Sequence, residues 1–422
     1  MTARTNSRRT WTALLAAVLS VVALTAMLSG CGGGGSPGGR ILFVGIDSAD
    51  WSVVQPLLDE GKLPNLSALV ESGVSCELHS LEPKQKSPTI WATIATGKLP
   101  EKHGIVDYID PMTKNLMTSN VRSARTFWDI LGEHGRTVTV IGWLVTWPAE
   151  EVNGYMVTDY FRFSPRPDRP LPEQLTYPDG LIEEISGQRV ASEDITDEEL
   201  GRLIDLDAAM SAEEAQRLPV DQMFLEMRSM NELDQRASAL ADIVAGDRTF
   251  FNVARYMMKT YPTDVEIVYL RGVDSASHKF WASWHPGEVG FPVSQTENRV
   301  FGETVRRYYQ YADEMLGELM DGFGEGTVIV CSDHGFEGPK PGQLPGGIND
   351  HGPRGVLVMS GEAFRTGVRI PECSVRDITP TVLALCGLPV GDDMDGAVIE
   401  GAFEPDFLRR HRPRSIATHE RS

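Results

Sequence analysis

The chain has few cysteines and a shortage of basic residues, and each shortage excludes a class of protein. Five cysteines among 422 residues are too few for a disulfide scaffold, and neither a Cys-x-x-Cys pair nor a Cys/His zinc finger occurs. Lysine and arginine number 39 against 59 aspartates and glutamates, a formal net charge of −20. Because phosphate backbones need a basic surface, this acidity argues against nucleic acid as a general partner. A small anionic substrate stays compatible, since bound cations reverse the local field.

No apolar run of membrane-spanning length occurs beyond the first 30 residues. At the N-terminus, Arg4, Arg8 and Arg9 precede an apolar run over residues 11–27 that ends in Leu28-Ser29-Gly30-Cys31. This ending resembles the bacterial lipobox, in which the peptidase cuts before the cysteine and the thiol is lipidated. A single transmembrane anchor is the alternative, but the run is short and a glycine tract follows it directly.

We therefore predict a lipoprotein signal peptide over residues 1–30, lipidation at Cys31 and a Gly-rich linker over 31–39. Two or three acyl chains hold a protein firmly on a membrane, whereas one binds only marginally. The expected location is extracytoplasmic, as a membrane-anchored bacterial lipoprotein of the cell envelope or periplasm.

Four cysteines remain beyond the lipobox: Cys76, Cys331, Cys373 and Cys386. In an oxidising compartment Cys373 and Cys386 could pair, but the sequence does not fix the connectivity. Cys331 lies in an apolar strand and is expected to be a buried free thiol.

Three continuous apolar runs each lead to an acidic residue. Residues 40–46 are followed by Asp47, residues 265–270 lead to Asp274, and residues 327–331 lead to Asp333-His334. Continuous apolar runs are typical of strands covered on both faces in a parallel sheet. Ligands of open α/β sheets bind outside the carboxyl ends of the strands, so the three acids are expected to share one site.

Helical patterns alternate with these strands, which predicts a doubly wound, mostly parallel α/β sheet flanked by helices. The predicted core comprises residues 40–160 and 246–406. Residues 161–245 are acidic and helical in pattern, and we interpret them as an inserted helical cap, with a plain surface excursion as the alternative. Residues 407–422 are expected to form a flexible tail.

The most informative segment runs from Lys86 to Gly97, with Ser87 near its start. Serine followed by Pro88 fits a helix start with serine at the N-cap and proline at the first helical position. The unpaired amides of such a first turn favour an anion, so a phosphoryl oxygen would be stabilised there. Plain capping is the alternative interpretation of an isolated Ser-Pro pair.

Six further side chains form a ligand set suited to Zn²⁺ and workable for Mn²⁺. Asp274 and His278 are four residues apart, so both can face one cation from the turn after a strand. Adjacent residues on a loop usually diverge, so Asp333 and His334 can approach a metal from different sides. The set is completed by Asp47 and by His351 in a Gly-rich loop.

These motifs resemble the alkaline phosphatase superfamily, in its type I phosphodiesterase/nucleotide pyrophosphatase branch. The likeness covers nearly all of residues 40–400 and is carried by Gly45-Ile-Asp47, Ser87 through Gly97, His103-Gly104-Ile105, Asp274-x-x-x-His278, Ser332-Asp-His-Gly335, His351 and Asp377 through Pro389. The resemblance implies two divalent cations, with Asp274, His278 and His351 on one and Asp47, Asp333 and His334 on the other.

By the same resemblance, Ser87 is the nucleophile, attacks phosphorus in line and forms a phosphoseryl intermediate that water hydrolyses. The chain departs from the branch where Asp107-Tyr108 replaces an asparagine that supports a phosphoryl oxygen, which makes nucleotide diesters less certain. The arylsulfatase pattern is absent, because Trp91 is followed by no arginine there, and sulfate esters are disfavoured.

The sequence thus predicts a hydrolase of small phosphate monoesters or diesters, and leaves the oligomeric state undetermined. One alternative is a transferase that moves a phosphoryl-linked group onto envelope glycans or lipids, although such relatives usually carry several membrane spans. The other is a catalytically silent binding lipoprotein. Lys84, Lys86 and Arg354 are candidate substrate contacts, Phe280, Trp281 and Trp284 are candidate walls of a leaving-group pocket, and His103 and His285 are expected to be structural or surface groups.

Overall fold

A nine-stranded sheet forms the centre of the molecule, with the strand order β11-β2-β10-β7-β1-β6-β3-β4-β5. The computed structural model describes residues 37–163, 170–340, 342 and 347–421. Neighbouring strands run parallel from β7 to β4, whereas β10 and β5 run antiparallel to their neighbours. The strands are β1 Ile41–Ile46, β2 Gly73–His79, β3 Val138–Ile141, β4 Gly154–Val157, β5 Thr176–Tyr177, β6 Val265–Leu270, β7 Thr327–Cys331, β10 Arg354–Ser360 and β11 Val368–Ser374.

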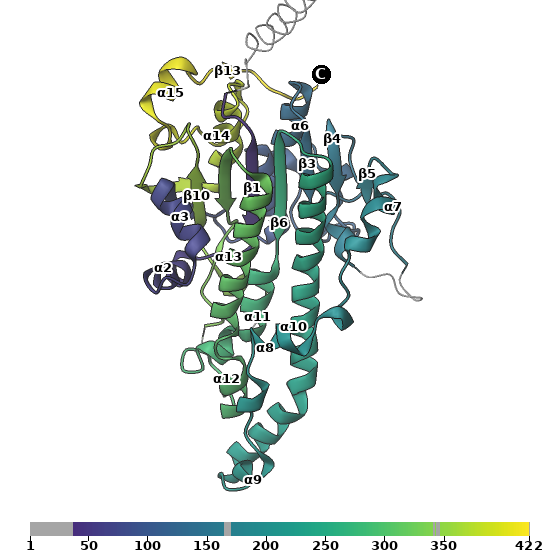
Figure 1. Ribbon diagram of the computed structural model, residues 1–422, viewed down its shortest axis with the longest axis vertical. Helices are drawn as coiled ribbons and strands as arrows, with labels where there is room; N and C mark the ends of the chain where they lie inside the picture. Colours follow the sequence, from purple (N-terminus) through teal and green to yellow (C-terminus); the bar gives the residue numbers. More distant parts are fainter. Residues whose placement is uncertain (1–36, 164–169, 341, 343–346, 422) are drawn as a thin grey trace, which may run out of the picture. The chain divides into compact units, whose positions relative to one another are not determined.

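Helices cover both faces of the sheet. Successive side chains of a strand point to opposite sides, so each strand contributes apolar residues to both faces. In β1, Leu42 and Val44 belong to one buried apolar cluster, and Ile41 and Phe43 to another. The first face carries α2 Trp51–Asp59, α3 Pro64–Ser72, α10 Val220–Thr260, α11 Gly272–Trp284 and α13 Thr304–Phe323; the second carries α4 Ser87–Thr96, α6 Phe127–Glu133 and α14 Ile378–Leu385. Figure 1 shows α10, α11 and α13 side by side on the first face. The predicted doubly wound α/β fold is confirmed.

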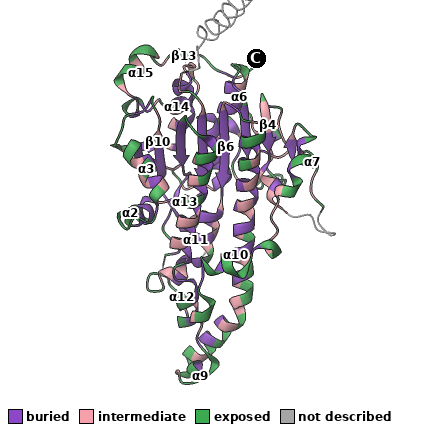
Figure 2. Cartoon of the chain, in the orientation of Figure 1, coloured by how far each residue is buried: buried purple, intermediate pink, exposed green. Residues whose placement is uncertain are grey.

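The predicted cap segment contains short helices and the first part of α10. These are α7 Leu181–Ile185, α8 Asp197–Gly201 and α9 Ala212–Ala215. The predicted boundary at residue 245 falls inside α10, which continues without a break to Thr260 and contacts β6. Leu200, Leu203 and Leu240 join the same apolar cluster as the sheet, so the segment shares the main core. Figure 2 shows that burial decreases along α10 toward α9, where Val220 and Phe224 are 67% and 62% exposed.

Helix ends follow ordinary sequence rules. Helix α6 begins with a capping box between Thr126 and Asp129, and α4 ends at Gly97 with a φ of 68°. The remaining helices are α5 Pro100–His103, α12 Gln295–Phe301 and α15 Pro405–Arg410.

In the described part of the chain, no helix is both long enough and apolar enough to cross a bilayer.

The C-terminal segment differs from the predicted flexible tail, because residues 407–421 contact the rest of the fold. Strand β13 Ser415–Ile416 pairs with β12 Val390–Gly391, and Glu420 lies 2.7 Å from the ammonium of Lys98. Lys98 is 4% exposed and forms ion pairs with Asp393 and with Glu420. The ion pair with Glu420 helps to hold the C-terminal segment against the rest of the fold.

One disulfide joins Cys76 of β2 to Cys373 of β11, and Cys331 and Cys386 are buried and outside it. The suggested pairing of Cys373 with Cys386 is therefore wrong, whereas the buried thiol predicted at Cys331 is observed. The two bridged cysteines are 297 positions apart and meet only because β2 and β11 are neighbouring strands. The predicted lipobox, with Cys31, lies outside the described residues.

Candidate active site

The carboxyl ends of three neighbouring parallel strands bring the predicted acids together. Asp47 follows β1 directly, Asp274 lies in the first turn of α11 after β6, and Asp333 lies two residues beyond β7. All three are buried, with 4% exposure or less. The convergence predicted from the three apolar runs is therefore observed.

One ligand group contains Asp47, Asp333 and His334. The Nε2 atom of His334 lies 3.4 Å from Asp47 Oδ1 and 3.4 Å from Asp333 Oδ2. The three residues offer ligand atoms that all lie within 4.8 Å of one another, which is close enough for a single cation to contact all of them.

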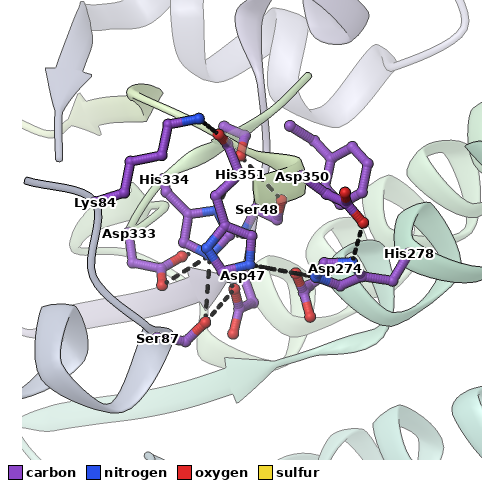
Figure 3. Close-up of polar contacts among 12 residues, drawn as sticks. Asp47, Ser48, Lys84, Ser87, Asp274, His278, Asp333, His334, Asp350 and His351 are labelled. Carbon is purple, nitrogen blue, oxygen red and sulfur yellow. Dashed lines mark hydrogen bonds and ion pairs between the residues drawn. The ribbon is translucent and has the colours of Figure 1, made fainter. Parts of the chain in front are cut away.

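The second group lies directly beside the first. His278 Nε2 is 3.2 Å from Asp274 Oδ1 and 3.2 Å from His351 Nε2, and the His351 nitrogen is 3.9 Å from the same carboxylate oxygen. The rings of His334 and His351 stack with centroids 3.7 Å apart, which joins the two groups. Figure 3 shows the six side chains converging on one small volume.

Ser87 points into this volume from the start of α4. Its Oγ atom lies 3.2 Å from His334 Nε2 and 3.4 Å from Asp47 Oδ1 (Figure 3). The predicted N-cap position is wrong by one residue, because Lys86 is the extended cap residue and Ser87 is the first helical one. No side-chain capping bond is formed at this helix start, so plain capping does not explain the serine.

The charges of the cluster suit divalent cations. Burial and the neighbouring carboxylates raise the pKa of Asp47 and of Asp333. Burial also acts to raise the pKa of Asp274, but His278, His334 and Arg271 together outweigh it and lower that pKa. Asp274 Oδ1 and Asp333 Oδ2 are enclosed by protein and accept no hydrogen bond within the described ranges. Buried carboxylates in such surroundings are costly unless a cation neutralises them. The mixed oxygen and imidazole donors match Zn²⁺ or Mn²⁺.

Three groups that the sequence did not single out support the ligands. The Tyr269 hydroxyl donates a hydrogen bond to Asp47 Oδ2, and the backbone N–H of Ser48 donates to Asp333 Oδ1 over 3.3 Å. Asp350 Oδ2 lies 3.1 Å from His278 Nδ1, the ring nitrogen turned away from Asp274. Such partners fix the orientation of a ligand. The position of Asp350 next to His351 was an available signal, whereas Tyr269 lies inside an apolar strand and gives none.

The basic residues suggested as substrate contacts interact with other groups of the protein. The Lys86 ammonium lies 2.7 Å from Asp107, and Arg354 lies 3.1 Å from Glu77 on the neighbouring strand. Lys84 donates to the backbone carbonyl of His351. Lys84 therefore supports the loop that carries a ligand, and the other two form ion pairs with Asp107 and Glu77.

The suggested aromatic walls and the two remaining histidines have structural surroundings. Phe280 stacks on Phe301 in the core, and the Trp281 ring lies 4.9 Å from that of Phe336, which in turn packs edge-on against His278. Phe336 thus packs against a ligand, as Tyr269 does through its hydroxyl. His103 is fully buried and is a structural group, as expected.

Comparisons with known proteins point to one family. The family model for type I phosphodiesterase/nucleotide pyrophosphatase matches residues 41–345, more than half of the chain. No curated protein sequence matches the chain.

Solved structures also match much of the chain. The putative sulfatase of Bacteroides thetaiotaomicron is 10% identical, with 90% of this chain and 76% of that one covered and a TM-score of 0.52. Murine ectonucleotide pyrophosphatase/phosphodiesterase 5 in complex with AMP is 12% identical, with coverage of 87% and 100% and a TM-score of 0.47. Phosphonoacetate hydrolase of Sinorhizobium meliloti is 16% identical, with coverage of 72% and 58% and a TM-score of 0.41.

Proposed function

The chain belongs to the type I phosphodiesterase/nucleotide pyrophosphatase family and is a phosphoric ester hydrolase, and we propose that Ser87 is its nucleophile and two divalent cations are its cofactors. The observation that carries this proposal is the position of Ser87 Oγ, in contact with Asp47 and His334 inside a buried cluster of three carboxylates and two imidazoles, to which the half-buried His278 adds a third imidazole.

Each proposed cation has three ligands from the chain. Asp47, Asp333 and His334 would hold one, and Asp274, His278 and His351 the other. When bound, the cations would supply charge that stabilises the serine alkoxide and the oxygens of the phosphoryl group. We propose zinc, with manganese as the alternative, because both accept carboxylate and imidazole donors.

The chain's own residues carry the covalent steps. Asp47 Oδ1 accepts the hydrogen bond of the Ser87 hydroxyl, and Tyr269 fixes that carboxylate from its other oxygen. Ser87 Oγ forms a bond to phosphorus while the bond to the leaving-group oxygen breaks, which gives a phosphoseryl intermediate. In this step the hydroxyl gives up its proton and the leaving group takes one up as an alcohol. Water then attacks phosphorus, the bond to Ser87 Oγ breaks, and a proton of that water returns to the serine oxygen.

The substrate class we propose is a small phosphate diester or monoester. At the position where diesterase relatives carry a supporting asparagine, Asp107 forms an ion pair with Lys86, so a phosphoryl oxygen must find its support elsewhere. We also propose that the protein acts at the cell envelope through a lipid at Cys31 and that residues 161–245 form a cap over the hydrolase core. Those two proposals rest on the sequence patterns.

The test combines metal analysis with release of nitrophenol from 4-nitrophenyl phosphate and bis(4-nitrophenyl) phosphate. The purified protein is expected to hold two equivalents of divalent metal and to cleave at least one ester. Ser87→Ala should abolish cleavage and retain the metal, whereas the control Ser52→Ala, an exposed serine on α2, should change neither. A metal-replete wild type inactive on both esters would instead favour the silent binding protein.

A further inference from the structure

A cavity of about 310 Å³ opens beside the catalytic cluster. It is lined by Tyr108, Leu144, Tyr160, Arg162, Tyr269 and Arg271, among others. Tyr269 connects the two places, because its ring lines the cavity and its hydroxyl donates to Asp47. Tyr269 therefore lies between the catalytic cluster and the cavity.

Two arginines with unused donors face this space. Arg271 follows β6, and Arg162 ends the short helix η2 Asp159–Arg162. Both also line a second cavity of about 630 Å³ that reaches under α10, so they stand where the two spaces meet. Within the described residues, no carboxylate oxygen lies within 4.0 Å of either guanidinium, and Arg271 Nε is enclosed without a hydrogen-bond partner. Other partly buried arginines do have such partners, as Arg236 does with Glu297 at 2.8 Å.

The nearby acids are already engaged. Asp159 accepts hydrogen bonds from the Val145 N–H and from the Thr146 hydroxyl, over 3.3 Å and 3.4 Å. Asp247 accepts from the backbone N–H groups of Arg271 and Gly272, each over 2.9 Å. Asp159 lines the first cavity and Asp247 the second, but each is paired with backbone or hydroxyl donors. Arg162 and Arg271, by contrast, line both cavities.

Two positive charges held near each other favour an anion between or beside them. Burial and the charge of Arg271 lower the pKa of Arg162. Burial also acts to lower the pKa of Arg271, but the nearby Tyr108, Tyr269 and catalytic carboxylates together outweigh it and raise that pKa. Arg271 also lies 5.8 Å from the ring centroid of Tyr108, which limits its orientations. Arg162 likewise lies 4.7 Å from the ring centroid of Phe163. Guanidinium groups bind phosphate and carboxylate through pairs of parallel hydrogen bonds, so an oriented pair of arginines that has no carboxylate partner among the described residues favours an anion.

We propose that Arg162 and Arg271 form a subsite for a second anionic group of the substrate, a phosphate or a carboxylate distinct from the phosphoryl group at Ser87. This inference rests on the proposed function and narrows it: the substrate is a phosphate ester whose organic part carries a further negative charge. Tyr108, Tyr160 and Phe250 also line the first cavity, and their aromatic rings suit the apolar part of the substrate's organic group.

The direct test is calorimetric titration of the metal-free protein with inorganic phosphate and, separately, with benzoate. Without cations the carboxylate cluster repels anions, so binding reports the arginine subsite alone. We expect one binding event, and the tighter probe identifies the preferred anion. Arg162→Met and Arg271→Met should each weaken it at least tenfold, Arg271→Lys less, and the control Arg354→Met should leave it unchanged. Failure of both phosphate and benzoate to bind, or binding to both Met variants as tightly as to wild type, would overturn the subsite.

A kinetic test uses two diesters with the same leaving group, 4-nitrophenyl phenyl phosphate and 4-nitrophenyl 4-carboxyphenyl phosphate. If benzoate is the tighter probe, the metal-replete wild type should prefer the carboxylated diester at least tenfold in kcat/KM. Arg271→Met should lose that preference and still cleave the neutral diester. If phosphate is tighter, a 4-phosphonophenyl diester takes the place of the carboxylated one. Wild type inactive on every diester would contradict the proposed function, while the metal-free titration would still decide the subsite.

Discussion

Protonation of His103 is expected to weaken the fold in mildly acidic solution. His103 is fully buried, its Nδ1 atom accepts the Ile105 N–H over 3.1 Å, and its Nε2 atom lies 3.0 Å from the Thr93 hydroxyl on α4. The acceptor role of Nδ1 requires the neutral ring. Burial, helped by the charge of Arg122, lowers the pKa of His103 from 6.5 to about 4.

The sign and size of the effect follow from linkage. Between pH 6.5 and pH 4 the unfolded chain binds a proton at this residue and the folded chain does not, so stability falls as the pH falls through that window. A pKa difference of this size corresponds to roughly 3 kcal/mol over the whole window, of which about 2 kcal/mol is lost between pH 7.5 and pH 5.

The assay is urea unfolding of wild type and of His103→Asn at pH 7.5 and pH 5. The variant keeps an acceptor for the Ile105 N–H but cannot be protonated. We expect the variant to have a lower free energy of unfolding than wild type at pH 7.5. The difference between the two free energies should be smaller by about 2 kcal/mol at pH 5. Other titrating groups are common to both proteins and cancel in the difference. A gap that stays constant, or widens, between the two pH values would refute the account of His103.

Three further perturbations test other parts of the structure. Asp350→Asn removes the carboxylate that faces His278 Nδ1 and should weaken binding of one metal equivalent about 10- to 100-fold in a competitive chelator titration; unchanged affinity for both equivalents would contradict its supporting role. Tyr269→Phe deletes the donor to Asp47 and should lower kcat/KM about tenfold with little change in the melting temperature, whereas full activity would show the bond to be dispensable. Cys76→Ser should reduce the free energy of unfolding by about 2–4 kcal/mol relative to the oxidised wild type, and equal stability would argue against the disulfide.

Much of the site could be predicted because it depends on local signals. Each apolar run that leads to an acid marks the carboxyl end of a parallel strand, so the sequence alone predicts Asp47, Asp274 and Asp333 at one edge of the sheet. Ser87 was distinguished by the resemblance of its surroundings to a family motif. Its exact place in the helix was missed by one residue, which is the usual precision of a helix boundary.

What could not be predicted depends on contacts between distant segments. Cys76 meets Cys373 only because two strands far apart in the sequence are neighbours in the sheet. The tail contacts the core through Glu420 and Lys98, and nothing in either segment alone indicates that ion pair. Arg162 and Arg271 come from the predicted cap segment and from the end of β6, so their shared cavity becomes visible only once the chain is folded.

The central claim is that Ser87 becomes covalently attached to phosphorus. The most direct measurement is mass spectrometry of the Ser87 peptide after the metal-replete enzyme is mixed with bis(4-nitrophenyl) phosphate and quenched in acid. The account predicts that this peptide, and no other serine peptide, gains the mass of the transferred 4-nitrophenyl phosphoryl group, and that the adduct is absent from Ser87→Ala. An unmodified Ser87 peptide during rapid turnover, together with an active Ser87→Ala variant, would contradict it.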